Sequence, residues 1–357
     1  MKWLRKTLIA AAVLVGIVIL AFAALILYLT ATEFRPPEET GAPVGGNPSK
    51  TLAAGDTIRV MTWNIGYGAL GSNADFFMDG GKMVYSSTSE RVQQNLEQMA
   101  DTIREEDPDI LFLQEVDRNS DRSYHVDQSA FFAEELPEAQ YCFAPNFLVK
   151  FVPYPIPPIG KVDGGIETLS KYPFAEGTRI QLPCPFSWPV RLGNLKRCLL
   201  INRIPIEGED KDLVLVNLHL EAYDSGEGKI AQTAMLKEIL EKEVQDGNYV
   251  IAGGDFNQSF SNIDTSAYAP QEGKWQPGYI DTGSFGEGWQ FLMDESTPSC
   301  RSLDQVYDGA DKDSFQFYLI DGFIVSGNLK VRSFRGIDKD FVNSDHNPVI
   351  LEVETGE

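Results

Sequence analysis

The chain has 357 residues, of which 43% are hydrophobic and 23% are charged, so it is long enough for one large domain or two modest ones. This composition is typical of an ordinary globular protein and excludes a disordered chain. The formal net charge of −22 repels polyanions at long range, which disfavours a grip on long nucleic acid, although a local cleft can still be positive.

The cysteine spacing argues against a structural zinc site. Cys142, Cys184, Cys198 and Cys300 form no C-x-x-C pair and no Cys/His pattern. Cys184 and Cys198 could form a disulfide in an oxidising compartment, and the sequence leaves that question open.

The N-terminal segment predicts a membrane anchor. Lys2, Arg5 and Lys6 precede residues 7–32, which contain no charged side chain. At about 1.5 Å per residue this run would form a helix of roughly 39 Å, longer than a hydrocarbon core of about 30 Å. Cleavable signal peptides usually have an apolar stretch of only about 7–15 residues, so an uncleaved single-pass anchor is favoured over secretion after cleavage. The basic residues predict that 1–6 is cytoplasmic and that the chain after the span is extracytoplasmic, at the cell membrane.

Residues 33–56 are expected to be a linker, because they hold four prolines and four glycines. If flexible, these residues would span roughly 27 Å root-mean-square. The domain that follows, expected over 57–357, would therefore lie close to the membrane.

The remaining chain alternates strand and helix patterns. Strands are expected where short apolar runs occur, at 58–65, 109–114, 211–220, 249–252, 315–325 and 348–351. Amphipathic spacing predicts helices over 89–106, with Ser89 as the cap, and over 225–244. Segments 66–88 and 258–314 follow neither pattern and are expected to be functional or partly structured loops.

A proline-rich apolar run, 151–159, cannot be a central strand. Two interpretations remain open for it. The run is either a rim that contacts lipid or holds an acyl or aromatic group, or a rigid loop that the rest of the domain covers.

Polar side chains that bind metals or move protons lie at the ends of the expected strands or within one of them. They are Asn64, Glu115, His219, Asp255, Asn257, Asp321, Asp345 and His346. Each position alone is explained by a turn or a solvated strand end. Loops at strand ends can converge on one cleft, however, and the set includes two of only three histidines, so a single site is favoured.

These segments resemble, in order, the motif series of the endonuclease/exonuclease/phosphatase superfamily. The motifs are TWNIG (62–66), LQEVD (113–117), ETLSKYPF (167–174), NLHL (217–220), GGDFN (253–257), LIDGFIVS (319–326) and SDHNPV (344–349). GGDFN and SDHNPV together are specific, and the resemblance covers about 57–354. It implies an α+β, DNase-I-like four-layer α/β/β/α sandwich, here preceded by one transmembrane helix, with a divalent metal at one rim.

The resemblance also implies how this site would bind a metal and a phosphate. Glu115 would be the principal metal ligand, with Asn64 and Asp345 on the metal side. Oxygen ligands suit Mg²⁺, with Mn²⁺ or Ca²⁺ as substitutes. His219 would contact the phosphate or protonate the leaving oxygen, as a catalytic residue, and Arg197 would contact the phosphate.

Four further residues would carry the chemistry. By the same resemblance, Asp255 and Asn257 would orient the attacking water and the phosphate. His346 would move a proton, and the Asp321 carboxylate would orient its ring. Phosphoester hydrolysis needs such groups to position water, neutralise the phosphoryl oxygens and stabilise the leaving group.

The expected function is that of a divalent-metal-dependent phosphodiesterase that acts outside the membrane. The membrane tether favours a lipid headgroup or other surface phosphodiester over nucleic acid. A surface DNA or RNA endonuclease with the same fold is the alternative, and a non-catalytic binding or scaffold domain is the alternative from another class. Protein partners cannot be identified from the sequence.

Overall fold

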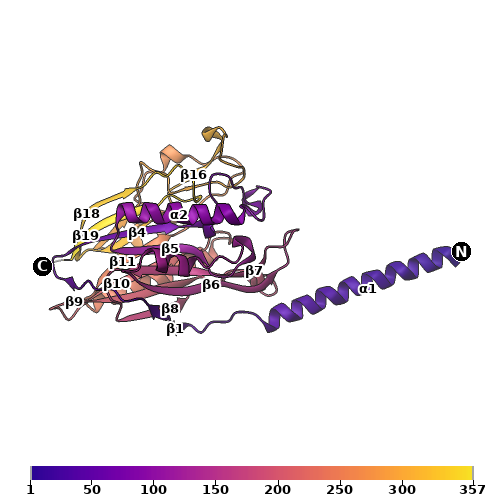
Figure 1. The fold of residues 1–357 in the computed structure, drawn as a ribbon, viewed down its shortest axis with the longest axis horizontal. Coiled ribbons are helices and arrows are strands. Elements are labelled where there is room, and N and C mark those ends of the chain that lie inside the picture. The colour runs from indigo at the N-terminus through magenta and orange to yellow at the C-terminus, as the bar shows by residue number, and fades with distance from the viewer. Residues whose placement is uncertain (1, 356–357) are drawn as a thin grey trace.

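The computed structural model describes residues 2–355. Two β-sheets lie face to face, and helices cover their outer faces (Figure 1). The first sheet contains, in spatial order, β1 (Glu39–Gly41), β8 (Glu176–Gln181), β9 (Cys198–Glu207), β10 (Asp212–His219), β11 (Tyr249–Asp255), β17 (Asp321–Ser326) and β14 (Trp289–Leu292), with β3 (Leu52–Ala53) beside β9. The second contains β18 (Leu329–Gly336), β19 (Val349–Thr355), β4 (Thr57–Asn64), β5 (Ile110–Asp117), β7 (Gly160–Ser170), β6 (Gln140–Val152) and β2 (Val44–Gly45).

Smaller elements complete the described chain. Two short ladders pair β12 (Gln258–Phe260) with β13 (Gly278–Ile280) and β15 (Cys300–Arg301) with β16 (Phe317–Tyr318). The α-helices are α1 (Lys2–Ala31), α2 (Ser89–Glu106), α3 (Gln128–Glu135) and α4 (Glu227–Gln245). The 3₁₀ turns are η1 (Gly66–Gly68), η2 (Phe77–Asp79), η3 (Asp121–Ser123), η4 (Val190–Gly193), η5 (Ser266–Tyr268), η6 (Thr282–Phe285) and η7 (Lys312–Ser314).

Alternating side chains on the central strands build the layers. On β4, Val60 packs between the two sheets, whereas Met61 packs outward in the cluster that includes the buried face of α2. On β10, Leu215 packs between the sheets and Val216 packs toward α4. Successive side chains of a strand point to opposite faces, so a strand that is covered on both faces needs apolar residues at consecutive positions. The structure therefore confirms the predicted four-layer α/β/β/α sandwich and the single apolar helix before it.

Helix α2 has the predicted bounds, but its cap is one residue earlier than expected. The Thr88 side chain, not that of Ser89, accepts a hydrogen bond from the backbone N–H of Arg91 (3.2 Å). Thr88 has the extended backbone conformation of an N-cap, whereas Ser89 is already the first helical residue.

Residues 33–56 do not form a free linker. Strand β1 pairs with β8, β2 pairs with β6, and β3 pairs with β9, so this segment is attached to both sheets. The prolines and glycines lie around these short strands and turns rather than in a flexible tether.

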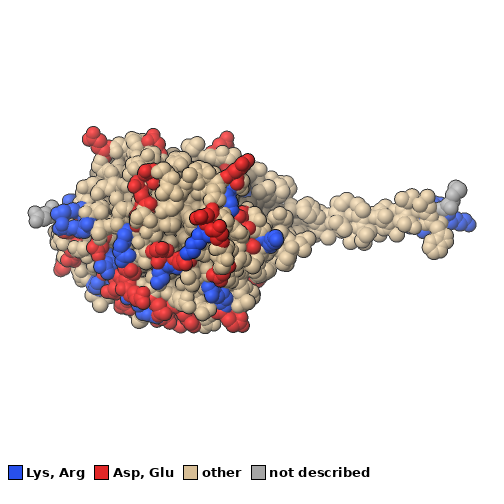
Figure 2. All heavy atoms as spheres, turned by 90° about the horizontal axis from the view of Figure 1, so that it is seen from above, with Lys and Arg blue, Asp and Glu red and all other residues tan. Residues whose placement is uncertain are grey.

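Helix α1 projects away from the globular part and is long and apolar enough to cross a membrane (Figure 1). Figure 2 shows acidic and basic side chains spread over the globular part, whereas along α1 basic side chains occur only at the far end. Leu29, near the C-terminal end of α1, is the one residue of this helix that is buried. All four cysteines are free thiols, with Cys184 exposed and Cys198 buried.

Candidate active site

Strand register brings the predicted site residues to one rim of the sandwich. In the second sheet, β4 and β5 are parallel, and Asn64 lies opposite Gln114, the residue before Glu115. In the first sheet, β10 and β11 are parallel, and His219 lies opposite Asp255. The carboxyl ends of both strand pairs therefore meet at the same edge.

The two remaining acids and His346 reach this rim from antiparallel strands. Asp321 begins β17 and lies opposite Asp255 on β11. Strand β19 runs antiparallel to β4, so the segment before it, with Asp345 and His346, returns to the end of β4. Seven of the nine predicted residues line one cavity of about 600 Å³, namely Glu115, Arg197, His219, Asp255, Asn257, Asp345 and His346. Asn64 and Asp321 lie directly behind them.

His346 and Asp321 form a buried hydrogen-bonded pair. The His346 Nδ1 lies 2.8 Å from the Asp321 Oδ2, and the indole N–H of Trp63 donates to the His346 carbonyl oxygen (2.9 Å). Burial, the largest single effect, lowers the pKa of His346, but Asp321, Cys300 and Asp345 together outweigh burial and the net pKa is well above the usual value. His346 is therefore an imidazolium at neutral pH, with its Nε2 turned toward the cavity residue Asp255 (3.8 Å).

Asp255 connects the polar groups of the site. Its Oδ2 accepts a hydrogen bond from Asn64 Nδ2 (3.0 Å) and lies 3.5 Å from His219 Nε2. Its Oδ1 accepts from the backbone N–H of Asn257 (2.8 Å). Burial, and then the nearby Asp321 carboxylate, raise the pKa of Asp255 to about 7. A carboxyl group with this pKa can exchange a proton near neutral pH.

His219 is buried like His346, but its surroundings lower its pKa instead of raising it. Burial, and then the Arg197 guanidinium, lower the pKa of His219 well below its usual value, so the ring is neutral. Its Nδ1 is buried and has no hydrogen-bond partner among the described residues. Arg197 donates to the His219 carbonyl oxygen (3.2 Å) and pairs with Glu221 (Nε to Oε2, 3.3 Å), so it holds the end of β10 as well as lining the cavity.

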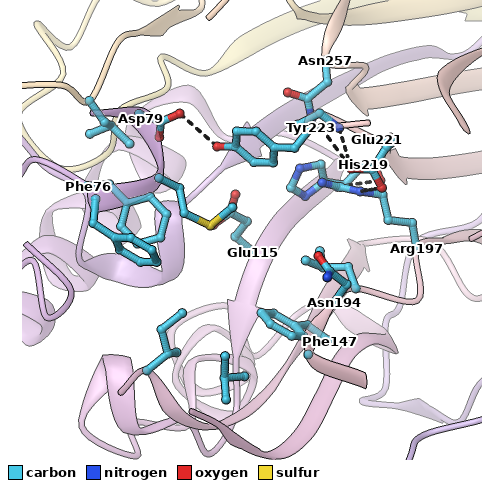
Figure 3. Close-up of a pocket in the computed structure, with 18 of the residues that line it drawn as sticks. Phe76, Asp79, Glu115, Phe147, Asn194, Arg197, His219, Glu221, Tyr223 and Asn257 are labelled. Carbon is cyan, nitrogen blue, oxygen red and sulfur yellow. Dashed lines mark hydrogen bonds and ion pairs between the residues drawn. The ribbon is translucent and has the colours of Figure 1, made fainter. Parts of the chain in front are cut away.

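Glu115 stands at an irregularity in β5. The register with β7 shifts between Leu113 and Val116, and Glu115 has a φ of +55°, which is unusual for a residue other than glycine. A bulge of this kind redirects a side chain out of the pleat, and the strain is typical of functional sites. Figure 3 shows the Glu115 side chain in the pocket near His219.

Glu115 and Asp345 fit a hard divalent cation. Burial raises the pKa of Asp345 to about 6; His346 lowers it, and the Glu115 carboxylate adds to the increase. Both acids line the same cavity. Among residues 2–355, neither lysine nor arginine forms an ion pair with either carboxylate. Two buried or half-buried carboxylates without such a partner are an oxygen ligand set of the kind that Mg²⁺ or Mn²⁺ takes.

Asn64 is oriented to position carboxylates. Its Nδ2 lies 3.2 Å from Glu115 Oε1 and donates to Asp255, and its Oδ1 accepts from the backbone N–H of Gly66 (3.1 Å). As an oxygen ligand of a metal, the predicted role of Asn64, the amide would have to turn over and give up the bond to Gly66. Its present geometry instead links the two halves of the site.

Two residues that the sequence analysis missed close the pocket from above. Tyr223 donates a hydrogen bond to Asp79 on η2 (3.1 Å), and Figure 3 shows these two side chains meeting across the pocket. Burial raises the pKa of Asp79 to about 7, with the Asp345 and Glu115 carboxylates contributing, although the bond from Tyr223 lowers it. Both residues come from segments without strand or helix periodicity, so no pattern indicated them.

Comparison with known proteins shows which family and which fold this chain shares. The Endonuclease/Exonuclease/phosphatase family model matches residues 61–346. An endonuclease/exonuclease/phosphatase from Beutenbergia cavernae DSM 12333 is 21% identical with a TM-score of 0.55, over 84% of this chain and 72% of its own. TDP2 from C. elegans is 18% identical (TM-score 0.51; 85% and 76% covered), and so is the human Nocturnin catalytic domain with bound sulfate anion (0.51; 88% and 97%). At such identities the solved structures establish the fold alone. Comparison with the sequences of curated proteins finds no match.

Proposed function

The chain belongs to the Endonuclease/Exonuclease/phosphatase family, whose members generally hydrolyse phosphoesters, and we propose that it is a phosphodiesterase in which water attacks phosphorus. One observation carries this proposal. The Asp321–His346 pair, Asp255, His219 and the Glu115–Asp345 carboxylates all meet at one cavity.

The pKa values of the three central groups suggest their roles. Asp255, held by Asn64 and by the backbone of Asn257, can orient a water and accept its proton. His346, kept protonated by Asp321, can donate to a phosphoryl or leaving oxygen on which negative charge develops. The neutral His219 can contact the phosphate without repelling the His346 imidazolium.

A divalent cation, when bound to Glu115 and Asp345, would neutralise phosphoryl oxygens and polarise the ester. The chain itself supplies the two carboxylates and the Asn64 amide that keeps Glu115 in place. Mg²⁺ is the proposed ion, with Mn²⁺ or Ca²⁺ as substitutes.

The proposed substrate is a lipid or other surface phosphodiester outside the membrane. Helix α1 supports this, because a domain joined to a membrane span has membrane lipids within reach. The net charge of −22 disfavours long polyanions, since each phosphate contact needs a positive side chain. A surface nuclease is the second candidate and shares the same catalytic residues. The proposed layout remains a cytoplasmic tip over 1–6, a span over 7–32 and a catalytic domain over 57–357.

The test is an activity panel on the full chain in vesicles, with Mg²⁺ or with a chelator. The substrates are vesicle phospholipids, bis(p-nitrophenyl) phosphate and plasmid DNA. We expect Mg²⁺-dependent hydrolysis of the two non-nucleic esters, and a fall of about 10²–10⁴-fold in His346→Ala. His125→Ala is the matched control, because His125 is exposed and does not line the cavity. Inactivity on the whole panel would contradict the proposal.

Metal binding is checked separately by calorimetric titration with Mn²⁺. Glu115→Gln is expected to weaken binding by at least about 10–100-fold. Glu134→Gln, an exposed acid on α3, should bind like the wild type. Equal binding by both variants would favour a non-catalytic domain.

A further inference from the structure

The cavity at the catalytic cluster continues into an apolar chamber. The same space of about 600 Å³ that the ionisable residues line is bounded elsewhere mainly by apolar side chains from β6, η4, the segment after η4, and α1, namely Phe147, Val152, Leu192, Leu195, Ile26 and Leu29. Asn146 and Asn194 lie among them. Its volume lies within the range of about 300–1,000 Å³ that is typical of small-molecule sites. Figure 3 shows Phe147 at the margin of the pocket, away from Asn257 and Tyr223.

Two residues of the candidate membrane span form part of this wall. Ile26 and Leu29 are three residues apart and so lie on one face of α1. Leu29 is 4% exposed, whereas Leu27, on another face of the same turn, is 70% exposed. The helix therefore presents a defined side to the cavity.

The end of α1 is fixed to the globular domain by several contacts. The indole N–H of Trp188 donates to Thr30 Oγ1 (3.1 Å). Just beyond the helix, the Glu33 carboxylate pairs with Arg191 (3.1 Å) and Lys196 (3.5 Å). Strand β1 follows and pairs with β8. These contacts, on both sides of η4, keep Leu29 at the cavity.

Large apolar side chains also project into solvent beside the same opening. Tyr154 and Val190 line the cavity and are 68% and 58% exposed, and Ile156 and Trp188 nearby in the chain are 94% and 52% exposed. Figure 1 shows the β6–β7 turn, which carries Tyr154 and Ile156, on the side of the domain from which α1 leaves. The run 151–159 is thus not a loop that the domain covers. Exposed apolar groups of this size beside a membrane span fit contact with lipid.

We infer that the apolar chamber holds an acyl chain of a membrane lipid whose phosphodiester lies at the catalytic cluster, and that α1 is part of this binding site. The inference rests on the proposed function and names what selects the substrate. The lipid enters from the bilayer around α1, past the side chains of 151–159 and 186–190. The anchor is then a component of the active site as well as a tether.

The apolar lining removes the cost of taking a lipid out of the bilayer. Each methylene transferred from an apolar medium to water weakens the equilibrium about fourfold, so a long chain could not pass through a wet site. Transfer from the bilayer to an apolar chamber is nearly neutral by comparison. Esters with acyl chains are therefore preferred over soluble esters, because only an acyl chain can move from the bilayer into the apolar chamber without entering water.

The test uses a pair of substitutions two residues apart on α1. Leu29→Trp adds volume inside the chamber, and Leu27→Trp adds the same volume on an exposed face; both keep the span apolar. The full chain is placed in vesicles of palmitoyl-oleoyl phosphatidylcholine, phosphatidylglycerol and sphingomyelin in equal parts. Hydrolysis of these lipids is measured beside hydrolysis of soluble bis(p-nitrophenyl) phosphate.

Leu29→Trp is expected to lower the ratio of lipid hydrolysis to soluble-diester hydrolysis about tenfold or more. Leu27→Trp should change neither rate. Equal rates for the two variants on both substrates would overturn the chamber while leaving the proposed function in place.

A binding measurement decides the case independently of catalysis. A phosphatidylcholine with a photoreactive group at the end of one acyl chain is added to the wild-type vesicles and irradiated. We expect labelled peptides from 147–152 and 192–195, with less label in Leu29→Trp. Label on α1 alone would contradict the inference, even if the protein hydrolysed no ester in the panel.

Discussion

His346 and His219 lie at the same cavity, yet their surroundings separate their pKa values. His346 lies beside Asp321 and is held protonated, whereas burial, and then the Arg197 guanidinium, keep His219 neutral. Asp255 lies within 3.8 Å of both rings. A site whose titratable groups have pKa values separated in this way can offer an acid and a base at one pH, which hydrolysis of an ester requires.

The Asp321→Asn substitution tests whether the Asp321 carboxylate keeps His346 protonated. Without the carboxylate beside Nδ1, the pKa of His346 should fall, because burial then acts unopposed by its main partner. The high-pH limb of the rate profile on bis(p-nitrophenyl) phosphate should therefore move to lower pH, with the maximal rate reduced about 10²-fold or more. The profile of His125→Ala should match the wild type. An unmoved limb in Asp321→Asn would remove Asp321 from this role.

Glu167, on β7, predicts a pH dependence of stability outside the active site. It is fully buried, its Oε1 accepts from Ser129, and burial raises its pKa from 4.5 to about 7. The folded state therefore binds a proton that the unfolded state has released between these pH values, so stability falls as pH rises through this window. The loss by pH 8 is about 3 kcal/mol relative to Glu167→Gln, which cannot ionise. Urea unfolding of the full chain in detergent at pH 4.5 and 8 measures this difference, and parallel curves for both proteins would contradict it.

At the scale of single elements, strand β5 shows how the fold positions the site. A regular strand would continue its alternation through Gln114 and Glu115. Gln114 keeps this alternation, because Ile110 and Phe112 also face the other sheet, and it donates across the sandwich to Asn217 Oδ1 (2.8 Å). The register shift then turns Glu115 toward the cavity. The positive φ of Glu115 is a local cost, of about 1–3 kcal/mol, that the sheet on either side maintains.

The cap of α2 gives a test of the local structure beneath the site. Thr88→Ala removes the acceptor for the Arg91 N–H and should lower the free energy of unfolding by about 1 kcal/mol. Ser89→Ala, one residue on, should change it by only a few tenths, since alanine suits a first-turn position. Chemical unfolding of both variants measures the difference. A larger effect at Ser89 would mean that Ser89, as the sequence pattern predicted, is the capping residue.

The sequence predicted those parts of the site that strands deliver. Glu115, His219 and Asp255 follow or end apolar runs, and the parallel register of these strands brings them together. Asp79 and Tyr223 were missed because they meet through the packing of two aperiodic segments. Likewise the sequence of α1 is apolar on every side, so no periodicity could indicate that Leu29 faces a cavity.

The pairing of residues 39–53 with the sheets was also beyond the sequence pattern. Prolines and glycines indicate turns, but they do not exclude strands of two or three residues between them. Partners for such short strands are set by tertiary context. The consequence for the whole molecule is that α1 and the domain are joined by attached chain rather than by a flexible tether.

On the scale of the whole molecule, the acidic composition and the apolar helix α1 are both consistent with the proposed lipid substrate. With a net charge of −22, the chain should bind plasmid DNA weakly. We expect supercoiled plasmid to remain intact in Mg²⁺ under conditions in which vesicle lipids are hydrolysed, as gel electrophoresis would show. Nicking that is lost in His346→Ala and kept in His125→Ala would instead favour the surface nuclease.

The most direct test of the central claim is hydrolysis of a phosphodiester in water enriched in ¹⁸O, with the products identified by ³¹P NMR and mass spectrometry. Attack of water on phosphorus predicts one ¹⁸O atom in the phosphate monoester and none in the released alcohol, in a reaction that needs Mg²⁺ and is lost in His346→Ala. Label in the alcohol, or an unchanged rate in His346→Ala, would contradict the account.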